Sequence, residues 1–282
     1  MTGFVDLFGG VKPLIGMVHL RPLPGSPADG TVEAALEAAR EDAETLVGAG
    51  ADGLIVENFG DAPFAKDRVP AATVAAMAII CRELRSDHNV AVGVNVLRND
   101  AEAALSIAHV TGADFFRVNV HIGAVVADQG VIEGKARETL LLRRALGARA
   151  LLFADVRVKH ARPLGGGGGR DAAGLVAEAK EAHGRGRADA LILSGIATGA
   201  PADPAEFAAV KAALPDTPLL VGSGVTTANL PSFWPVCDGV IVGTATKRGG
   251  DPHTPVVPEL ARELVGAASR LRRTTESSRS QG

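Results

Sequence analysis

Two short runs of small residues are the part of this sequence whose spacing points most directly to chemistry. They are VGSGVT (221–226) and VGTATK (242–247), and each begins at the end of an apolar run. Small residues at such positions let backbone amides approach an anion, so the pair is typical of a phosphate site. The predicted donors are the amides of Gly222, Ser223, Gly224, Gly243 and Thr244, and Lys247 could add charge. The alternative is that these glycines only make tight turns.

Two carboxylates are candidates for general acid or base catalysis. Glu57 and Asp155 each end an otherwise apolar run, and partial burial favours the protonated form of a carboxylic acid, which suits proton transfer near neutral pH. The alternative for each is a structural ion pair with Arg117 or Lys159. Lys159 could instead form a Schiff base with a carbonyl substrate, but nothing in the sequence shows that its ammonium loses a proton easily.

Other polar residues at the ends of apolar runs are candidates for substrate binding. These are His19, Asn58, Asn95, Arg117, Asn119, His160 and Ser194. Arg117 and Asn119 alternate with Val118, so both point to the same side of a strand. If that side faces inward they reach a substrate, and if it faces outward they only pack against helices.

A metal site has weak support in the sequence. His19 and His160 could bind a metal together with Glu57 or Asp155. No HxH or HExxH spacing supports this, and isolated histidines are usually satisfied by local hydrogen bonds. We therefore predict no cofactor and no metal ligand, and leave a divalent metal open as an alternative.

Eight short apolar runs are the elements that must position these side chains. They span 14–18, 53–56, 91–96, 115–120, 151–156, 190–193, 219–222 and 239–243, with helical patterns between them. Strands that are apolar throughout and alternate with helices form a parallel sheet covered by helices. Eight such units predict one α/β domain, a (β/α)₈ barrel over 11–271, preceded by a lead-in over 1–10 and followed by a disordered tail over 272–282. In such a barrel the polar strand ends converge on one face.

A doubly wound open sheet is the alternative fold. That fold carries its glycine fingerprint after the first strand, whereas the informative glycines here follow the seventh and eighth runs. Five consecutive glycines at 165–169 lie in the fifth loop, which suits either a mobile lid over 162–170 or a plain disordered loop. The run lacks the GxxxxGK[ST] spacing of a nucleotide-binding loop.

Composition excludes several classes of partner. The formal net charge is -3, from 29 basic and 32 acidic residues without a basic block, so nucleic acid is not an expected partner. The two cysteines form no CxxC pair, which fits a reducing cytoplasm. No signal-peptide pattern opens the chain, and its longest apolar run, 71–81, is too short to span a bilayer. We expect a cytoplasmic protein without membrane insertion, and leave a homo-oligomer open.

Several strings together resemble the BtpA family, also called the BtpA/SgcQ family, from Lys12 to about Leu271. They are KPLIGMVHLRPLPGSP, VENFGDAPF, NVLRNDAEAAL, FFRVNV followed by DQGVIEGKA, ADVRVKHARPL, LILSGIATG, VGSGVT and VGTATK. The matched positions are His19, Glu57, Asn58, Asp61, Asn95, Asn119, Asp155, Lys159, His160, Ser194, Gly222, Ser223, Gly224, Gly243 and Thr244. The visible departure from the family pattern is the run of five glycines.

The resemblance implies a TIM-like barrel and leaves two functions open. The family is named for a protein implicated in photosystem I biogenesis, while other members are grouped with phosphosugar metabolism or carry labels such as phosphoribosylanthranilate isomerase or nucleosidase. Our first hypothesis is an enzyme acting by acid/base chemistry on a phosphorylated sugar or nucleotide-like molecule, as an isomerase, aldolase or nucleosidase would. The second is a non-catalytic biogenesis or stability factor for a membrane complex. The sequence does not determine the substrate or the reaction class.

Overall fold

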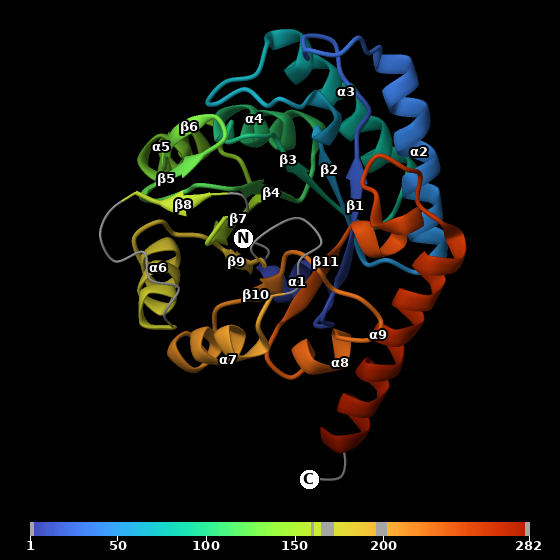
Figure 1. Cartoon of the computed structure of the whole chain (residues 1–282), viewed down its shortest axis with the longest axis vertical. Helices are drawn as coiled ribbons and strands as arrows, with labels where there is room; N and C mark the ends of the chain where they lie inside the picture. The colour runs from blue at the N-terminus through green and yellow to red at the C-terminus, as the bar shows by residue number, and fades with distance from the viewer. Residues whose placement is uncertain (1–2, 159–160, 165–171, 196–201, 280–282) are drawn as a thin grey trace.

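The eight predicted apolar runs form one parallel sheet that closes on itself (Figure 1). The structure is a computed structural model, and it describes residues 3–158, 161–164, 172–195 and 202–279. The strands are β1 (Leu14–His19), β2 (Gly53–Glu57), β3 (Ala91–Asn95), β4 (Phe115–Val118), β7 (Leu151–Val156), β9 (Ala190–Leu193), β10 (Leu219–Val221) and β11 (Gly239–Val242). β1 pairs with both β2 and β11, which closes the barrel. The predicted fold class is confirmed.

Helices cover the outer surface of the barrel, as the helical patterns predict (Figure 1). They are α2 (Val32–Ala49), α3 (Ala71–Asp87), α4 (Ala101–Thr111), α5 (Ala136–Leu146), α6 (Ala172–Gly184), α7 (Pro204–Ala213), α8 (Leu230–Phe233) and α9 (Pro258–Arg279). The predicted start of α2 is confirmed, because the Thr31 hydroxyl accepts a hydrogen bond from the Ala34 amide at 3.2 Å. Over the described ranges, none of the helices combines the length and apolarity needed to cross a bilayer.

The N-terminal segment covers the end of the barrel opposite the carboxyl ends of the strands. Its short helix α1 (Phe4–Leu7) places Phe4 and Phe8 in a buried cluster with Phe115 and Phe153. The rings of Phe115 and Phe153 stack with their centroids 4.4 Å apart inside the barrel. Because side chains alternate along a strand, the inward position of Phe115 also places Arg117 inside. This register settles the question that the sequence left open for Arg117.

A small antiparallel sheet beside the barrel was not predicted. It consists of β5 (Ala124–Ala127), β6 (Gly130–Glu133) and β8 (Arg162–Pro163), in the order β6-β5-β8. These strands are very short and almost entirely exposed or half-exposed, so they lack the continuous apolar pattern by which the barrel strands were recognised. The first residues of the predicted lid therefore pair with β5, while its glycine run at 165–169 lies outside the described residues.

The C-terminal helix is longer than the sequence indicated. A disordered tail was expected from Arg272 onward, but α9 continues to Arg279. The Arg272 guanidinium donates to the carbonyl of Lys12 at 3.1 and 2.8 Å and also pairs with Asp52. Over 272–279 the expectation was wrong, because a polar segment can be held by hydrogen bonds to the barrel, which composition does not reveal.

Candidate active site

One pocket at the carboxyl ends of the strands is lined by eight of the sixteen predicted site residues. It is lined by Met17, His19, Glu57, Phe59, Arg117, Gly222, Ser223, Gly224, Val225, Ile241, Val242, Gly243 and Thr244. The ionisable side chains therefore share a cavity with the loops that follow β10 and β11. A cavity of about 390 Å³ at the opposite end of the barrel is lined by residues such as Leu7, Gly112 and Gly147. It lies away from all of the predicted site residues.

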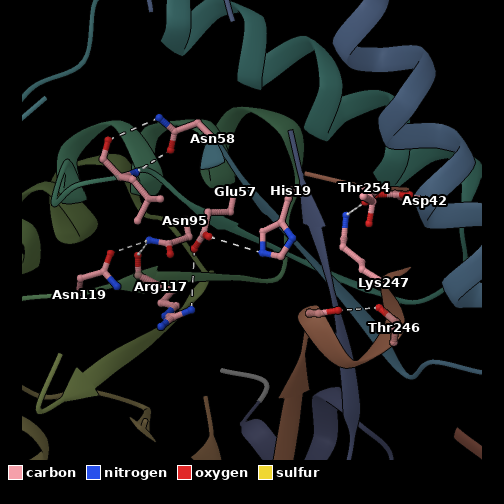
Figure 2. A network of polar contacts seen from close by, with 12 residues as sticks. His19, Asp42, Glu57, Asn58, Asn95, Arg117, Asn119, Thr246, Lys247 and Thr254 are labelled. Carbon is pink, nitrogen blue, oxygen red and sulfur yellow. Dashed lines mark hydrogen bonds and ion pairs between the residues drawn. The ribbon is translucent and has the colours of Figure 1, made fainter. Parts of the chain in front are cut away.

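Glu57 lies between two cationic or potentially cationic side chains (Figure 2). Its Oε1 is 3.9 Å from Nε2 of His19, and its Oε2 is 3.9 Å from a terminal nitrogen of Arg117. All three side chains are at least nine-tenths buried, with exposed fractions of 7% for His19, 8% for Glu57 and 4% for Arg117. In such surroundings charges interact more strongly than they do in water. The arrangement suits a carboxylate that exchanges a proton with a ligand.

Asp155 is held by three hydrogen bonds. Its two oxygens accept hydrogen bonds from Arg117 Nε at 2.8 Å, from a terminal Arg117 nitrogen at 2.9 Å, and from Asn119 Nδ2 at 2.8 Å. Burial by itself would lower the pKa of Arg117, but the charge and hydrogen bonds of Asp155, together with the charge of Glu57, raise it overall. The structure thus shows the ion pair that was the alternative for Asp155, and this pair keeps Arg117 charged and oriented.

Two predicted polar residues retain unused hydrogen-bonding capacity. Asn95 donates to Asn119 Oδ1 at 3.2 Å and to the Arg117 carbonyl at 3.3 Å, but no described residue hydrogen-bonds its own Oδ1. The buried Ser194 hydroxyl likewise has no hydrogen-bond partner in the described ranges. A buried polar group without a partner costs about 1–3 kcal/mol, so both groups would gain from contact with a polar ligand.

The Asn58 side chain joins neighbouring loops by hydrogen bonds and does not line the pocket. Its side chain is fully buried, accepts a hydrogen bond from the Leu97 amide at 2.7 Å, and donates to Asp61 Oδ2 at 2.9 Å. Asp61 also accepts a hydrogen bond from the Leu23 amide at 2.8 Å. Burial raises the pKa of Asp61, and these two hydrogen bonds oppose that shift. The predicted substrate role of Asn58 does not match this position, because its polar atoms are used to join the loops after β1, β2 and β3.

The two loop glycines bring neighbouring strands close together. The Gly222 amide donates to the Leu193 carbonyl at 2.8 Å, so it is not available to an anion. A Cβ atom on Gly222 would lie 2.4 Å from both Ser194 Oγ and Ile192 Cγ2, and one on Gly243 would lie 2.9 Å from Cε1 of His19. Close packing, which is neither a turn nor an anion contact, is thus the structural reason for glycine at 222.

The remaining loop amides retain the ability to donate. In the described part of the chain no acceptor hydrogen-bonds the amides of Ser223, Gly224, Val225, Gly243 and Thr244, and all five residues line the pocket. Gly224 has φ +71°, a left-handed conformation that glycine adopts without strain. Successive amides that alternate between right- and left-handed conformations form concave anion sites. The Ser223 hydroxyl accepts a hydrogen bond from the Gly195 amide at 3.2 Å.

Lys247 is turned away from the pocket (Figure 2). Its ammonium is 3.1 Å from Asp42 Oδ2 and donates to the carbonyl of Thr254 at 2.7 Å, while Asp42 Oδ1 accepts from the Val256 amide at 2.7 Å. The predicted phosphate contact of Lys247 is therefore wrong for this structure. Lys247 follows the 3-10 turn η2 (Thr244–Thr246), and the buried carboxylate of Asp42 on α2 supplies the charge that neutralises its ammonium.

Two residues near the site were not predicted to contribute. Phe59, in the 3-10 turn η1 (Phe59–Asp61) directly after Glu57 and Asn58, lines the pocket. Arg98 is 7% exposed, and burial lowers its pKa although the charges of nearby acidic groups, Asp155 first among them, act to raise it. The sequence signal for Phe59 was its place in the VENFG string, where aromatic character could have been read as a pocket wall.

Lys159 and His160 lie outside the described residues, so their predicted roles in Schiff-base formation and substrate binding stay predictions. Among the residues that are described, no three His, Cys, Asp or Glu side chains come together in a way that could hold a metal ion.

The closed parallel barrel, with ionisable side chains collected at the carboxyl ends of its strands, defines a TIM-barrel protein. The chain belongs to the BtpA family, which it matches over residues 10–270. It is 47% identical to an uncharacterised protein of Thermococcus kodakarensis, over 94% of this chain and 98% of that protein. It is 44% identical to the photosystem I biogenesis protein BtpA of Synechocystis sp., over 88% of this chain and 84% of that protein.

The fold is also found in solved structures with little sequence similarity. N-(5'-phosphoribosyl)anthranilate isomerase from Pyrococcus furiosus aligns over 92% of this chain and 99% of its own, with a TM-score of 0.57 and 15% identity. At that level of identity the likeness establishes a shared barrel and nothing about activity.

Proposed function

We propose that this protein is an enzyme that binds a phosphorylated sugar or nucleotide-like molecule and transfers a proton on it. One observation carries the proposal: a single pocket is lined both by loop amides that can donate and by the buried cluster of Glu57, His19 and Arg117. Donor amides without charged side chains suit a phosphate group, since they supply directed hydrogen bonds and still allow close approach. A carboxylate held in the same cavity is within reach of the rest of such a ligand.

In this proposal, some residues of the pocket bind the phosphate and others transfer the proton. The amides of Ser223, Gly224, Val225, Gly243 and Thr244 would hold the phosphate oxygens. Glu57 would act as the general base or acid because it lines the pocket, whereas Asp155 accepts hydrogen bonds from Arg117 and Asn119. Arg117, fixed by that ion pair, would stabilise negative charge that develops on the substrate, and it needs no rearrangement to do so. His19, 3.9 Å from Glu57, would share the transferred proton.

A non-catalytic role in assembly of a membrane complex is the second candidate, supported by the name of the Synechocystis relative. That role makes no use of a pocket that combines donor amides with a buried acidic and basic cluster. The two candidates therefore differ in whether a small phosphorylated ligand stabilises the protein.

The test is a thermal-shift panel of sugar phosphates and nucleoside monophosphates, each paired with its unphosphorylated form. A ligand present at about 100 times its Kd stabilises the fold by about 2.7 kcal/mol, which is readily detected. We expect at least one phosphorylated compound to raise Tm, with its unphosphorylated partner having no effect and inorganic phosphate competing. A flat panel would overturn the enzyme proposal and favour the assembly role.

Glu57→Gln then separates binding from proton transfer. The amide is nearly the same size as the carboxylate, so we expect the Kd for the best phosphorylated ligand to change by no more than about threefold. We expect conversion of that ligand, or deuterium uptake from D₂O followed by NMR, to fall by about 10²–10⁴-fold. Asp155→Asn is measured in the same assay, so that loss of the second predicted carboxylate is compared with loss of the first. Unchanged conversion in Glu57→Gln would remove Glu57 from the mechanism.

A further inference from the structure

Phe59 is a partly buried phenylalanine that lines the pocket, and a second one, Phe64, lies against it. The chain has nine phenylalanines, all within the described ranges, and no tyrosine. Seven of the nine are buried, and the two that remain are Phe59 and Phe64. Apolar aromatic surface in contact with water is unfavourable. In this chain, which is poor in aromatic residues, the partly exposed phenylalanines are Phe59, which lines the pocket, and its neighbour Phe64.

Phe59 is the centre of this group of rings. Its centroid lies 4.9 Å from that of His19, 5.4 Å from that of His253 and 6.1 Å from that of Phe64. Phe59 and His19 both line the pocket, so part of the Phe59 ring faces the cavity that holds the loop amides and Glu57. His253 is exposed, and it closes the group on the solvent side.

Buried polar contacts hold the two segments that carry Phe59 and His253. On one side, the Asn58 and Asp61 side chains are joined at 2.9 Å across the turn that contains Phe59. On the other, Lys247 is joined to Asp42 at 3.1 Å and to the Thr254 carbonyl at 2.7 Å, which fixes the segment that contains His253. The position of the aromatic group is therefore set before any ligand arrives, and pre-organised surfaces lose little entropy on binding.

We infer that the ligand of this pocket carries a flat unsaturated ring, as a nucleobase does, and that this ring stacks on Phe59. The inference rests on the proposed function, which it narrows from phosphorylated molecules in general to those with a heteroaromatic group. A plain sugar phosphate offers an aromatic side chain only the small C–H face of its ring, which is a smaller apolar surface than the face of a planar base. A nucleobase has a π-face that stacks on an aromatic side chain whatever its hydrogen-bonding edge, and polar edge atoms that His19 and His253 can approach.

Calorimetric titration of the full chain with three probes tests the inference. The probes are adenosine 5'-monophosphate, ribose 5-phosphate and adenosine, which separate the ring from the phosphate. We expect the monophosphate to bind at least about tenfold more tightly than ribose 5-phosphate, since stacking on an aromatic side chain gives an advantage of this order. Uridine and guanosine monophosphates are tested in parallel, because stacking tolerates different bases.

Two variants identify the residue responsible. Phe59→Leu keeps apolar volume but removes the aromatic face, and should weaken binding of the best nucleoside monophosphate about tenfold while leaving ribose 5-phosphate unchanged. Phe64→Leu is the matched control, because Phe64 contacts Phe59 without lining the pocket, and it should change both affinities less than threefold. The melting temperature of each variant is measured to show that it is folded.

The outcomes separate this inference from the proposed function. If ribose 5-phosphate and the monophosphates bind equally, or if Phe59→Leu affects both alike, the ring inference is overturned while the phosphate site stands. If adenosine binds as tightly as its monophosphate and Phe59→Leu weakens both, the ring inference stands and the phosphate proposal fails. If no probe binds, the ring inference is overturned, and the thermal-shift panel of sugar phosphates decides the phosphate proposal.

Discussion

Replacement of Lys247 by methionine should destabilise the protein without weakening phosphate binding. The Lys247 ammonium lies 3.1 Å from Asp42, and the two side chains are 2% and 9% exposed. With an effective dielectric constant of 20, the attraction between two unit charges about 3.1 Å apart is about 5 kcal/mol. Part of that energy is offset by desolvation of the two groups, but removal of one partner leaves the other buried and unpaired, which typically costs about 3–5 kcal/mol.

The expected change in Tm follows from the size of the chain. The entropy of unfolding is about 2.1 cal/mol/K per residue, or about 0.6 kcal/mol/K for a chain of 282 residues. We therefore expect Lys247→Met to lower Tm by about 5–8 °C. At 25 °C, where the variant is still folded, its affinity for ribose 5-phosphate should stay within twofold of the original, because the ammonium does not line the pocket.

Differential scanning calorimetry with two further variants checks the reasoning. Asp42→Asn added to Lys247→Met removes the unpaired charge and keeps an acceptor for the Val256 amide, so it should recover part of the lost stability. Arg262→Met, which breaks an exposed pair with Glu259, should cost less than about 1 kcal/mol. A Lys247→Met protein as stable as the original, with tenfold weaker phosphate binding, would refute the structural role of this lysine.

Two further predictions concern packing and pH. Gly222→Val should lower the free energy of unfolding by about 1–3 kcal/mol in urea titrations, because its Cβ would lie 2.4 Å from Ser194 Oγ and Ile192 Cγ2; an equally stable variant would contradict the close approach of β9 and β10 at this glycine. Burial lowers the pKa of His121 against the opposing effect of its hydrogen bond to the Gly186 carbonyl, so below about pH 6.5 the unfolded chain takes up a proton that the folded chain does not. The free energy of unfolding should therefore fall as pH drops from 7.5 to 5, and His121→Gln should reduce that fall. An equal pH slope in the two proteins would contradict this role of His121.

Several features follow from the sequence alone because they depend on local patterns. A strand buried on both faces must be apolar along its whole length, and this requirement made all eight barrel strands recognisable. The ends of those strands converge in any such barrel, so the co-location of Glu57, Arg117 and the loop after β11 in one pocket was also predictable. The family could be recognised because its strings are spread along nearly the whole chain.

The use of each polar group was decided only by the tertiary structure. Glu57 and Asp155 look alike in sequence, yet Asp155 meets the guanidinium of Arg117 and the amide of Asn119, while Glu57 lines the pocket. Gly222 follows its strand as Gly243 does, yet its amide completes the pairing with Leu193.

The same limit explains the expectations that failed. Lys247 pairs with Asp42 across 205 residues of sequence, and Arg272 donates to the Lys12 carbonyl across 260. The partner of a charged side chain depends on which distant segment folds against it and on the direction in which each side chain leaves the backbone. Local sequence patterns specify the apolar face of an element and its ends, but the pairing of polar atoms is a property of the closed barrel, because burial makes every such group take whichever partner lies within hydrogen-bond distance.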